Sequence, residues 1–225
     1  MNTILSAILD NNQARVRELL KADRGLAVRR VEEAKLYQSK IFHWLYAGDT
    51  ALHLAAAGHR EQIARTLLAA GADPNSAANH RRGAPLHYAA DGYIIGPAWD
   101  PNSQVLTIRV LLNAGADIHI RDKNGATALH RAVRTRCAAA VCCLLDAGAD
   151  PTQKNISGST AFHLAVQCTG RGGSGAEMAI AAQRQIIEKL LSFGVSPALK
   201  DGKGKSVSDW ATSTWIRNLL SEYAA

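Results

Sequence analysis

The chain has 225 residues, a length that fits one large domain or two small ones. Hydrophobic residues make up 47% and charged residues 20% of it, as in ordinary globular proteins, and no apolar run is long enough to cross a membrane. The formal net charge is +7, but it is spread evenly, with 13 basic and 10 acidic residues over 1–113 and 13 and 9 over 114–225. Without a basic arm, we expect no specific nucleic-acid binding and no membrane partner.

The amino terminus, MNTILSAILDNNQARVRELL, has no basic start, long apolar middle or small-residue cleavage site. We therefore expect no cleaved signal peptide and a cytoplasmic protein, while export by a route that needs no such signal, as for an effector, stays open. The four cysteines form no C-x-x-C pair, and we interpret them as small apolar residues of a reducing compartment. They are Cys137, Cys142, Cys143 and Cys168.

Two phrases recur along the chain. The first is read as GDTALHLAA from Gly48, GAPLHYAA from Gly83, GATALHRAV from Gly125 and GSTAFHLAV from Gly158. The second follows as LLAAGADPN, LLNAGADIH, LLDAGADPT and LLSFGVSPA. A unit of about 33 residues with a T-P-L-H-x-A phrase resembles the ankyrin repeat, a β-turn followed by two helices. The resemblance is strong over residues 48–200 and weaker at both ends.

The resemblance implies an all-α ankyrin-repeat solenoid, in which stacked helix pairs carry projecting β-turn fingers. We expect a single domain over 1–225. Its expected units are an N-terminal capping unit with a long loop at 1–47, repeats at 48–82, 83–124, 125–157 and 158–203, and a C-terminal cap at 204–225. In that cap Trp210 and Trp215 are expected to cover the last apolar face. For the odd stretch between residues 24 and 47 we expect a packed hairpin that uses Tyr37, Phe42, Trp44 and Tyr46.

Local signals agree with these helices. Threonine can N-cap a helix, proline suits its first position as at Pro85, and glycine supplies a left-handed C-cap. The expected N-caps are Thr50, Thr127 and Thr160, and the expected C-caps are Gly71, Gly115 and Gly148.

Every first phrase contains a histidine. In the family that this chain resembles, this histidine is structural and fixes the turn before the first helix, so a structural role is implied for His53, His87, His130 and His163. The other histidines show no ligand spacing with cysteine or carboxylate. We therefore expect no metal and no cofactor.

Two repeats contain insertions between their first and second helices, GYIIGPAWDP at 92–101 and CTGRGGSGAE at 168–177. In the second, Gly170, Gly172 and Gly175 match the G-x-G-x-x-G spacing of a dinucleotide-binding turn. That turn needs a strand before it, whereas a first helix is expected here, so we interpret the match as accidental. Two alternatives remain for this loop, a flexible connector or an anion site formed by glycine N–H groups and Arg171.

The resemblance implies a non-enzymatic recognition module that binds a protein partner through its concave face and fingers, and we expect it to be a monomer. The exposed positions of the first helices are expected at Leu54, Ala57, Tyr88, Asp91, Arg131, Arg134, Leu164 and Gln167. The alternative function is binding of a small anionic ligand, or of a segment that bears phosphate or carboxylate, in a basic cleft between the two insertions.

That cleft would have Trp99 and Tyr88 on one side and arginines on its floor, because Arg131 and Arg134 lie three residues apart on one helix. Arg136 takes a position that is usually glycine. Removing Arg131 is then expected to leave stability nearly unchanged. The competing interpretation pairs Asp91 with Arg134 and leaves Arg131 in solvent. The candidate binding residues are Tyr88, Asp91, Trp99, Arg131, Arg134, Arg136, Gln167 and Arg171; no catalytic residue is expected.

Overall fold

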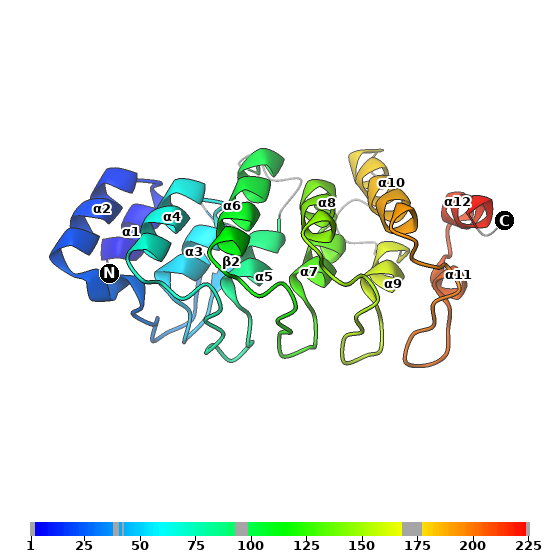
Figure 1. Ribbon diagram of the computed structural model, residues 1–225, viewed down its shortest axis with the longest axis horizontal. Coiled ribbons are helices and arrows are strands. Elements are labelled where there is room, and N and C mark those ends of the chain that lie inside the picture. The colour runs from blue at the N-terminus through cyan, green and yellow to red at the C-terminus, as the bar shows by residue number, and fades with distance from the viewer. Residues whose placement is uncertain (1–2, 38–40, 42, 93–98, 168–176, 224–225) are drawn as a thin grey trace.

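The computed structural model describes residues 3–37, 41, 43–92, 99–167 and 177–223, and over these the chain forms a row of stacked helix pairs (Figure 1). The first pairs are α1 (Thr3–Leu9) with α2 (Gln13–Ala22), α3 (Ala51–Ala57) with α4 (Glu61–Ala69), and α5 (Pro85–Ala90) with α6 (Pro101–Asn113). They continue as α7 (Ala128–Arg134) with α8 (Ala138–Asp146), α9 (Ala161–Ala165) with α10 (Glu177–Ser192), and α11 (Val207–Trp210) with α12 (Thr214–Glu222). The predicted all-α solenoid is confirmed.

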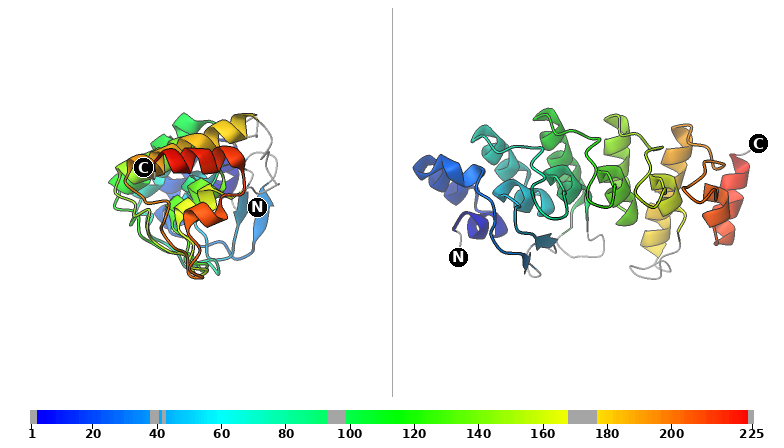
Figure 2. Two further views of the ribbon diagram at one scale, coloured as in Figure 1. Left: turned by 90° about the vertical axis from the view of Figure 1, so that its right-hand side faces the viewer. Right: turned by 90° about the horizontal axis from the view of Figure 1, so that it is seen from below.

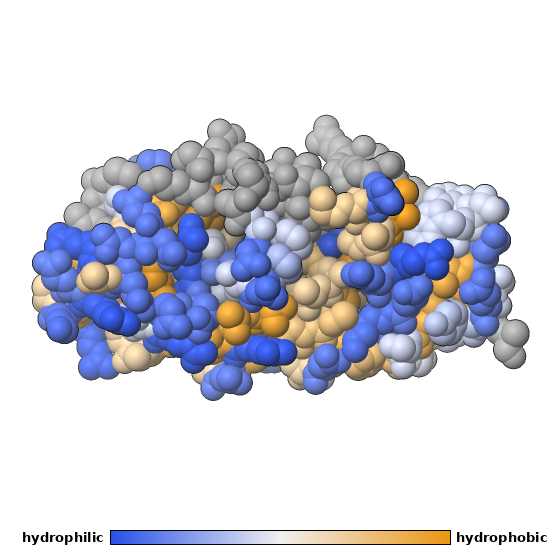
Figure 3. Space-filling model, turned by 90° about the horizontal axis from the view of Figure 1, so that it is seen from above, coloured by the Kyte–Doolittle hydropathy of each residue, from blue (hydrophilic) through white to orange (hydrophobic). Residues whose placement is uncertain are grey.

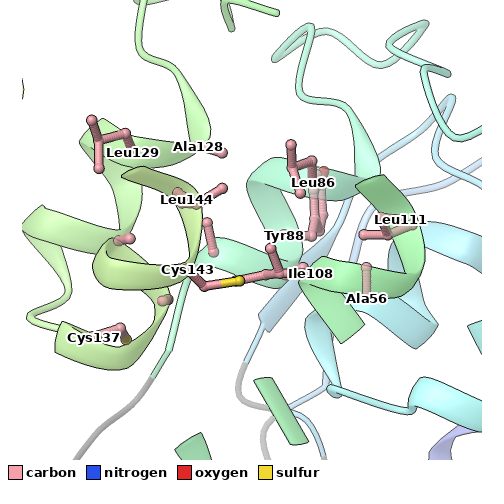
Figure 4. Packing of buried hydrophobic residues seen from close by; sticks show 14 of the residues in the cluster. Ala56, Leu86, Tyr88, Ile108, Leu111, Ala128, Leu129, Cys137, Cys143 and Leu144 are labelled. Atoms are coloured by element: carbon pink, nitrogen blue, oxygen red, sulfur yellow. The ribbon is translucent and has the colours of Figure 1, made fainter. Parts of the chain in front are cut away.

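The first helices of the pairs form one row and the second helices another, with the connecting fingers projecting from one side (Figures 1 and 2). Neighbouring helices within each row pack on one another, as α5 does on α3 and α7 and as α8 does on α6 and α10. Alanine makes this close approach feasible, because Ala55 and Ala56 on α3 and Ala89 and Ala90 on α5 are all fully buried. In the second row, Cys143 of α8 points toward Ile108 of α6 (Figure 4). The core is therefore a strip that runs the length of the stack.

The ends of these helices follow the sequence signals. Thr50, Thr127 and Thr160 are the N-caps of α3, α7 and α9, and Pro85 is the first residue of α5. The glycines after the second helices have positive φ, as the C-cap prediction requires: Gly71 (100°), Gly115 (86°) and Gly148 (94°).

The four phrase histidines join neighbouring repeats. His53 accepts the Thr50 backbone N–H at Nδ1 (3.0 Å) and donates from Nε2 to the Gly83 carbonyl of the next finger (3.1 Å). His87, His130 and His163 repeat this arrangement with the carbonyls of Ala126, Ser159 and Lys205. Burial is the main cause that lowers the pKa of all four below the usual value. Their structural role is confirmed, and they are neutral donors at neutral pH.

The segment between α2 and α3 contains the short helix η1 (Arg24–Ala27) and an antiparallel hairpin of β1 (Lys35–Tyr37) and β2 (His43–Leu45), in which Leu36 pairs with Trp44. The predicted hairpin is therefore present, although Phe42 lies outside the described residues. It lies beside the row of first helices (Figure 2), and β2 contacts α3.

The C-terminal pair buries aliphatic residues more completely than aromatic ones. Trp210 and Trp215 are half-buried against the core, whereas Val207 and Ile216 are fully buried. Trp210 donates from its indole to Asp201 (3.1 Å) and meets the His163 ring edge-on. The two tryptophans do contact the last apolar face, but Ile216 and its aliphatic neighbours are its main cover.

Candidate functional site

The hairpin is fixed to the first-helix row by His43. Its Nε2 lies 3.3 Å from Asp91 Oδ2 at the end of α5, and its ring centroid lies 4.6 Å from that of Tyr88. Because β2 crosses α3 and reaches α5, it occupies part of the surface that plain repeats leave open. The sequence analysis missed this role of His43, since contacts 48 residues apart leave no local pattern.

Asp91 is the centre of a charged network. It accepts hydrogen bonds from Arg131 (2.7 Å) and Arg134 (3.4 Å) of α7, and Arg131 also binds Asp122 of the preceding finger (2.8 Å). Burial alone would raise the pKa of Asp91, but the hydrogen bond from His43 and the charge of Arg131 lower it below its usual value. The carboxylate is thus ionised and shared among three donors.

Two of the candidate site residues are therefore structural. Arg131, expected in solvent or on the floor of a cleft, has a side chain only 10% exposed because carboxylates approach it from two sides. Tyr88 was expected to face solvent, but it is 1% exposed and donates to Asp49 (2.7 Å). Leu54, likewise expected to be exposed, is 1% exposed beneath the hairpin side of the stack. Only the pairing of Asp91 with Arg134 was anticipated.

Next to the hairpin lies a group of aromatic and basic side chains, which we name the aromatic ridge: Trp44, Tyr46, His80 and Arg81. Trp44 is 46% exposed and stacks on Tyr46 at 6.3 Å between ring centroids. His80 meets the Tyr46 ring edge-on, and Arg81 lies 5.0 Å above it while donating to its hydroxyl. Exposed tryptophan, tyrosine and arginine are the residue types that contribute most to protein interfaces.

A pocket, which we name the α7–α9 pocket, lies between the fourth and fifth repeats. Its volume is about 160 Å³. It brings together three candidate residues, Arg134, Arg136 and Gln167. The described residues that line it are Val133, Arg134, Arg136, Leu164, Ala165, Gln167, Gln183 and Ile186.

Arg136 follows α7 with a left-handed φ of 59°, which explains why glycine is usual at this position. The residue is nevertheless only 8% exposed, and it lines the pocket. Gln183, which the sequence analysis missed, donates to the carbonyls of Ala165 (2.7 Å) and Gln167 (3.3 Å). A lone glutamine on the apolar stripe of α10 is the signal that could have identified it.

The remaining candidates do not complete the predicted cleft. Trp99 is half-buried and donates to Gln104 (3.3 Å), apart from the lining of the α7–α9 pocket. Arg171 and the glycine turn lie outside the described residues. The helices that flank that loop are α9 and α10, so no strand precedes the G-x-G-x-x-G match. This agrees with its interpretation as accidental.

In the described part of the chain, no group of three histidine, cysteine or acidic residues is arranged to hold a metal ion. None of the helices described there has the length and apolar character needed to cross a membrane. The face of the second helices is largely hydrophilic at its N-terminal end, with hydrophobic residues gathered in the middle, over α6 and α8 (Figure 3).

Stacked helix pairs, threonine N-caps and histidines that join successive fingers define a helical repeat protein. Comparison with family models gives the particular family: the ankyrin repeat matches residues 47–79 and 84–123, and the model for many copies of ankyrin repeats matches residues 111–165. The chain belongs to the ankyrin repeat family. Repeats of this family generally mediate protein–protein interactions.

Proposed function

We propose that residues 1–225 act as one non-enzymatic recognition domain that binds a protein partner through the fingers and the first-helix face. The observation that supports this most directly is the aromatic ridge. Trp44 is 46% exposed and stacks on Tyr46, over which Arg81 lies. Its exposed ring leaves apolar surface in water, which is unfavourable, and contributes little to the core. A partner that covers it would remove that area from water.

The first-helix face divides into two parts. The hairpin covers α3 and α5 through His43, whereas α7 and α9 present Arg134, Leu164 and Gln167 at least partly to solvent. A partner segment that starts at the aromatic ridge would therefore meet basic and amide groups farther along the stack. The cysteines among the described residues, Cys137, Cys142 and Cys143, are unpaired, which supports a reducing compartment such as the cytoplasm as its location.

Affinity capture from the native source tests this function. The wild-type protein, Trp44→Ala and Phe193→Ala serve as baits, because Phe193 is 43% exposed at the end of α10 and is a matched control. We expect one protein to be captured by the wild type and by Phe193→Ala, and its affinity to fall at least about tenfold for Trp44→Ala. Equal capture by both variants would contradict the role of the aromatic ridge.

A second candidate function is the binding of an anionic group at the α7–α9 pocket. It is supported by Arg134 and Arg136, two guanidinium groups that line one small hollow without a carboxylate among its described lining residues. This version differs from the cleft expected between the insertions, since Arg131 and Tyr88 are structural.

A further inference from the structure

The α7–α9 pocket has two kinds of wall. Val133, Leu164, Ala165 and Ile186 supply aliphatic surface, and Arg136 supplies charge. A cavity of about 150 Å³ holds one benzene ring, so the volume of about 160 Å³ measured here admits a group of similar size. A carboxylate on a three-carbon stem has as many heavy atoms as benzene.

Arg136 is the unusual member of this lining. It is 8% exposed, yet its guanidinium forms no hydrogen bond or ion pair with any residue in the described part of the chain. None of its guanidinium nitrogens is among the fully buried atoms that lack a partner, so they reach solvent and are open to a ligand. The left-handed backbone adds strain for a residue with a side chain, and glycine would remove that strain. The stability of the chain therefore does not explain the arginine.

An equivalent residue elsewhere in the stack shows the contrast. His59 lies nine residues after its N-cap Thr50, as Arg136 does after Thr127, and has a similar φ of 52°. The His59 ring donates to the carbonyls of Ala89 (3.2 Å) and Asp91 (3.1 Å) at the end of the next first helix.

The corresponding helix end two repeats farther on is bound differently. Gln104 donates to the Ala89 carbonyl, as His59 does, at the end of α5, whereas among the described residues Gln183 is the side chain that donates to the corresponding carbonyls of Ala165 and Gln167 at the end of α9. Arg136 thus stands at a position whose usual partners are at hand and is not bound to them. The residue lines the pocket instead.

We propose that the α7–α9 pocket binds a carboxylate on a short aliphatic stem, with Arg136 as its anchor. The planar guanidinium binds a carboxylate through two parallel hydrogen bonds, and the aliphatic walls cover the stem. Arg134, with a side chain 61% exposed, adds positive charge at the rim. This inference rests on the second proposed function and specifies its ligand.

A phosphate group suits the pocket less well. Its larger charge calls for several donors, whereas the amide of Gln183 is already used by two carbonyls and the aliphatic walls offer none. Arg134 is already paired with Asp91, so Arg136 and the apolar walls match a monoanion better.

Butyrate is the probe, with butyramide as its neutral counterpart and inorganic phosphate as the alternative anion. Binding is followed by the NMR shift of the arginine Nε–H signals and by the melting temperature of the full chain. We expect butyrate to shift one arginine signal and to raise the melting temperature, and butyramide to do neither. Phosphate binding in place of butyrate would overturn the carboxylate inference but retain an anion site, and binding of neither would overturn both.

Two matched variants separate binding from structure. Arg136→Gly should weaken butyrate binding at least about tenfold and, by relieving the strain of the left-handed backbone, raise the melting temperature of the free protein by about 2–4 °C. His59→Gly, at the equivalent position, should lower the melting temperature because it loses two hydrogen bonds. If Arg136→Gly lowers it as much as His59→Gly does, Arg136 is a structural residue and the proposal is wrong.

The protein captured in the affinity experiment shows whether the carboxylate belongs to a partner protein or to a free small molecule. If excess butyrate releases that partner, the carboxylate belongs to an acidic side chain or chain terminus of the partner protein. If the partner stays bound and mass spectrometry finds a small carboxylic acid on the natively purified protein, the ligand is a free acid. A partner that stays bound, with no acid on the native protein, would contradict a physiological carboxylate site.

Discussion

Arg131 Nη1 lies 2.7 Å from Asp91 Oδ2, a contact that joins the fourth repeat to the end of the first helix in the third. The same guanidinium binds Asp122, so one cation is shared by two carboxylates. Neither partner is more than 11% exposed at its side chain. Water therefore has little access to these carboxylates to take the place of the arginine as a hydrogen-bond donor.

Arg131→Ala should lower the free energy of unfolding by about 3–5 kcal/mol, since it removes the cation that two buried carboxylates share. Denaturation in urea measures the change. Arg134→Ala is the control, because its side chain is 61% exposed and a surface pair contributes about 0–1 kcal/mol. Equal, small effects of both would restore the sequence-based expectation that Arg131 can be removed without loss of stability.

Tyr88→Phe removes one of the donors to the buried carboxylate of Asp49. Asn79 (2.6 Å) and the Tyr46 backbone N–H (2.7 Å) remain, so the free energy of unfolding should fall by about 1–3 kcal/mol. A thermal melt of the variant beside the wild type checks this. An unchanged melting temperature would mean that the hydrogen bond from the Tyr88 hydroxyl to Asp49 does not contribute to stability.

Stability should decrease as the pH falls from 6.5 to 4. Burial lowers the pKa of His59 to about 4, and it lowers the pKa of His53, His130 and His163 in the same direction. Between those pH values the unfolded chain binds more protons than the folded one, so His59 alone costs on the order of 3 kcal/mol by pH 4.

Urea titrations at several pH values measure this loss. His59→Gln keeps an amide donor for the same carbonyls but does not titrate, and its free energy of unfolding should depend less steeply on pH. A slope identical to that of the wild type would show that the histidine is already protonated in the folded protein.

Deleting residues 206–225 should expose the apolar face of the fifth repeat and cause association, because terminal units shield a solenoid. Ile216→Ala is the milder test, and its fully buried side chain predicts a loss of about 2–5 kcal/mol. Light scattering and melting curves report the two effects. A truncated chain that stays monomeric and melts like the parent would show that this pair is not a cap.

Native cysteine labelling should distinguish Cys137 from Cys142. Burial raises the pKa of the Cys137 thiol to about 11, and the residue is inaccessible, whereas Cys142 is half-exposed on α8. Iodoacetamide followed by peptide mass spectrometry should find Cys142 modified and Cys137 intact until the protein is unfolded.

The fold could be predicted because its signals are local. Threonine N-caps, Pro85 and the C-cap glycines act within a few residues of themselves, and each phrase histidine repeats one contact with the next finger. Four copies of one unit then specify how the units stack. The hairpin was anticipated from its aromatic residues, which had no place in an ordinary finger.

The site was harder to predict because its contacts lie between repeats. The exposure of Arg131 depends on Asp122 in the preceding finger and on Asp91 in another helix, and helical spacing alone gave neither. Tyr88 seemed exposed because the carboxylate of Asp49 was not known to lie beneath it. Arg136, by contrast, was identified from a local fact, the glycine that it replaces.

The hairpin contact of His43 with Asp91 has a consequence for how the chain comes apart. In a plain array each unit loosens independently from the ends, since it touches only its neighbours. Here His43 of β2 contacts Asp91, and Asp91 contacts Arg131. These two contacts link the segment before the second repeat to the fourth repeat. Fraying at the N-terminal end must therefore break a bond two repeats farther on, and amide exchange in α3, α5 and α7 should rise together as one cooperative block.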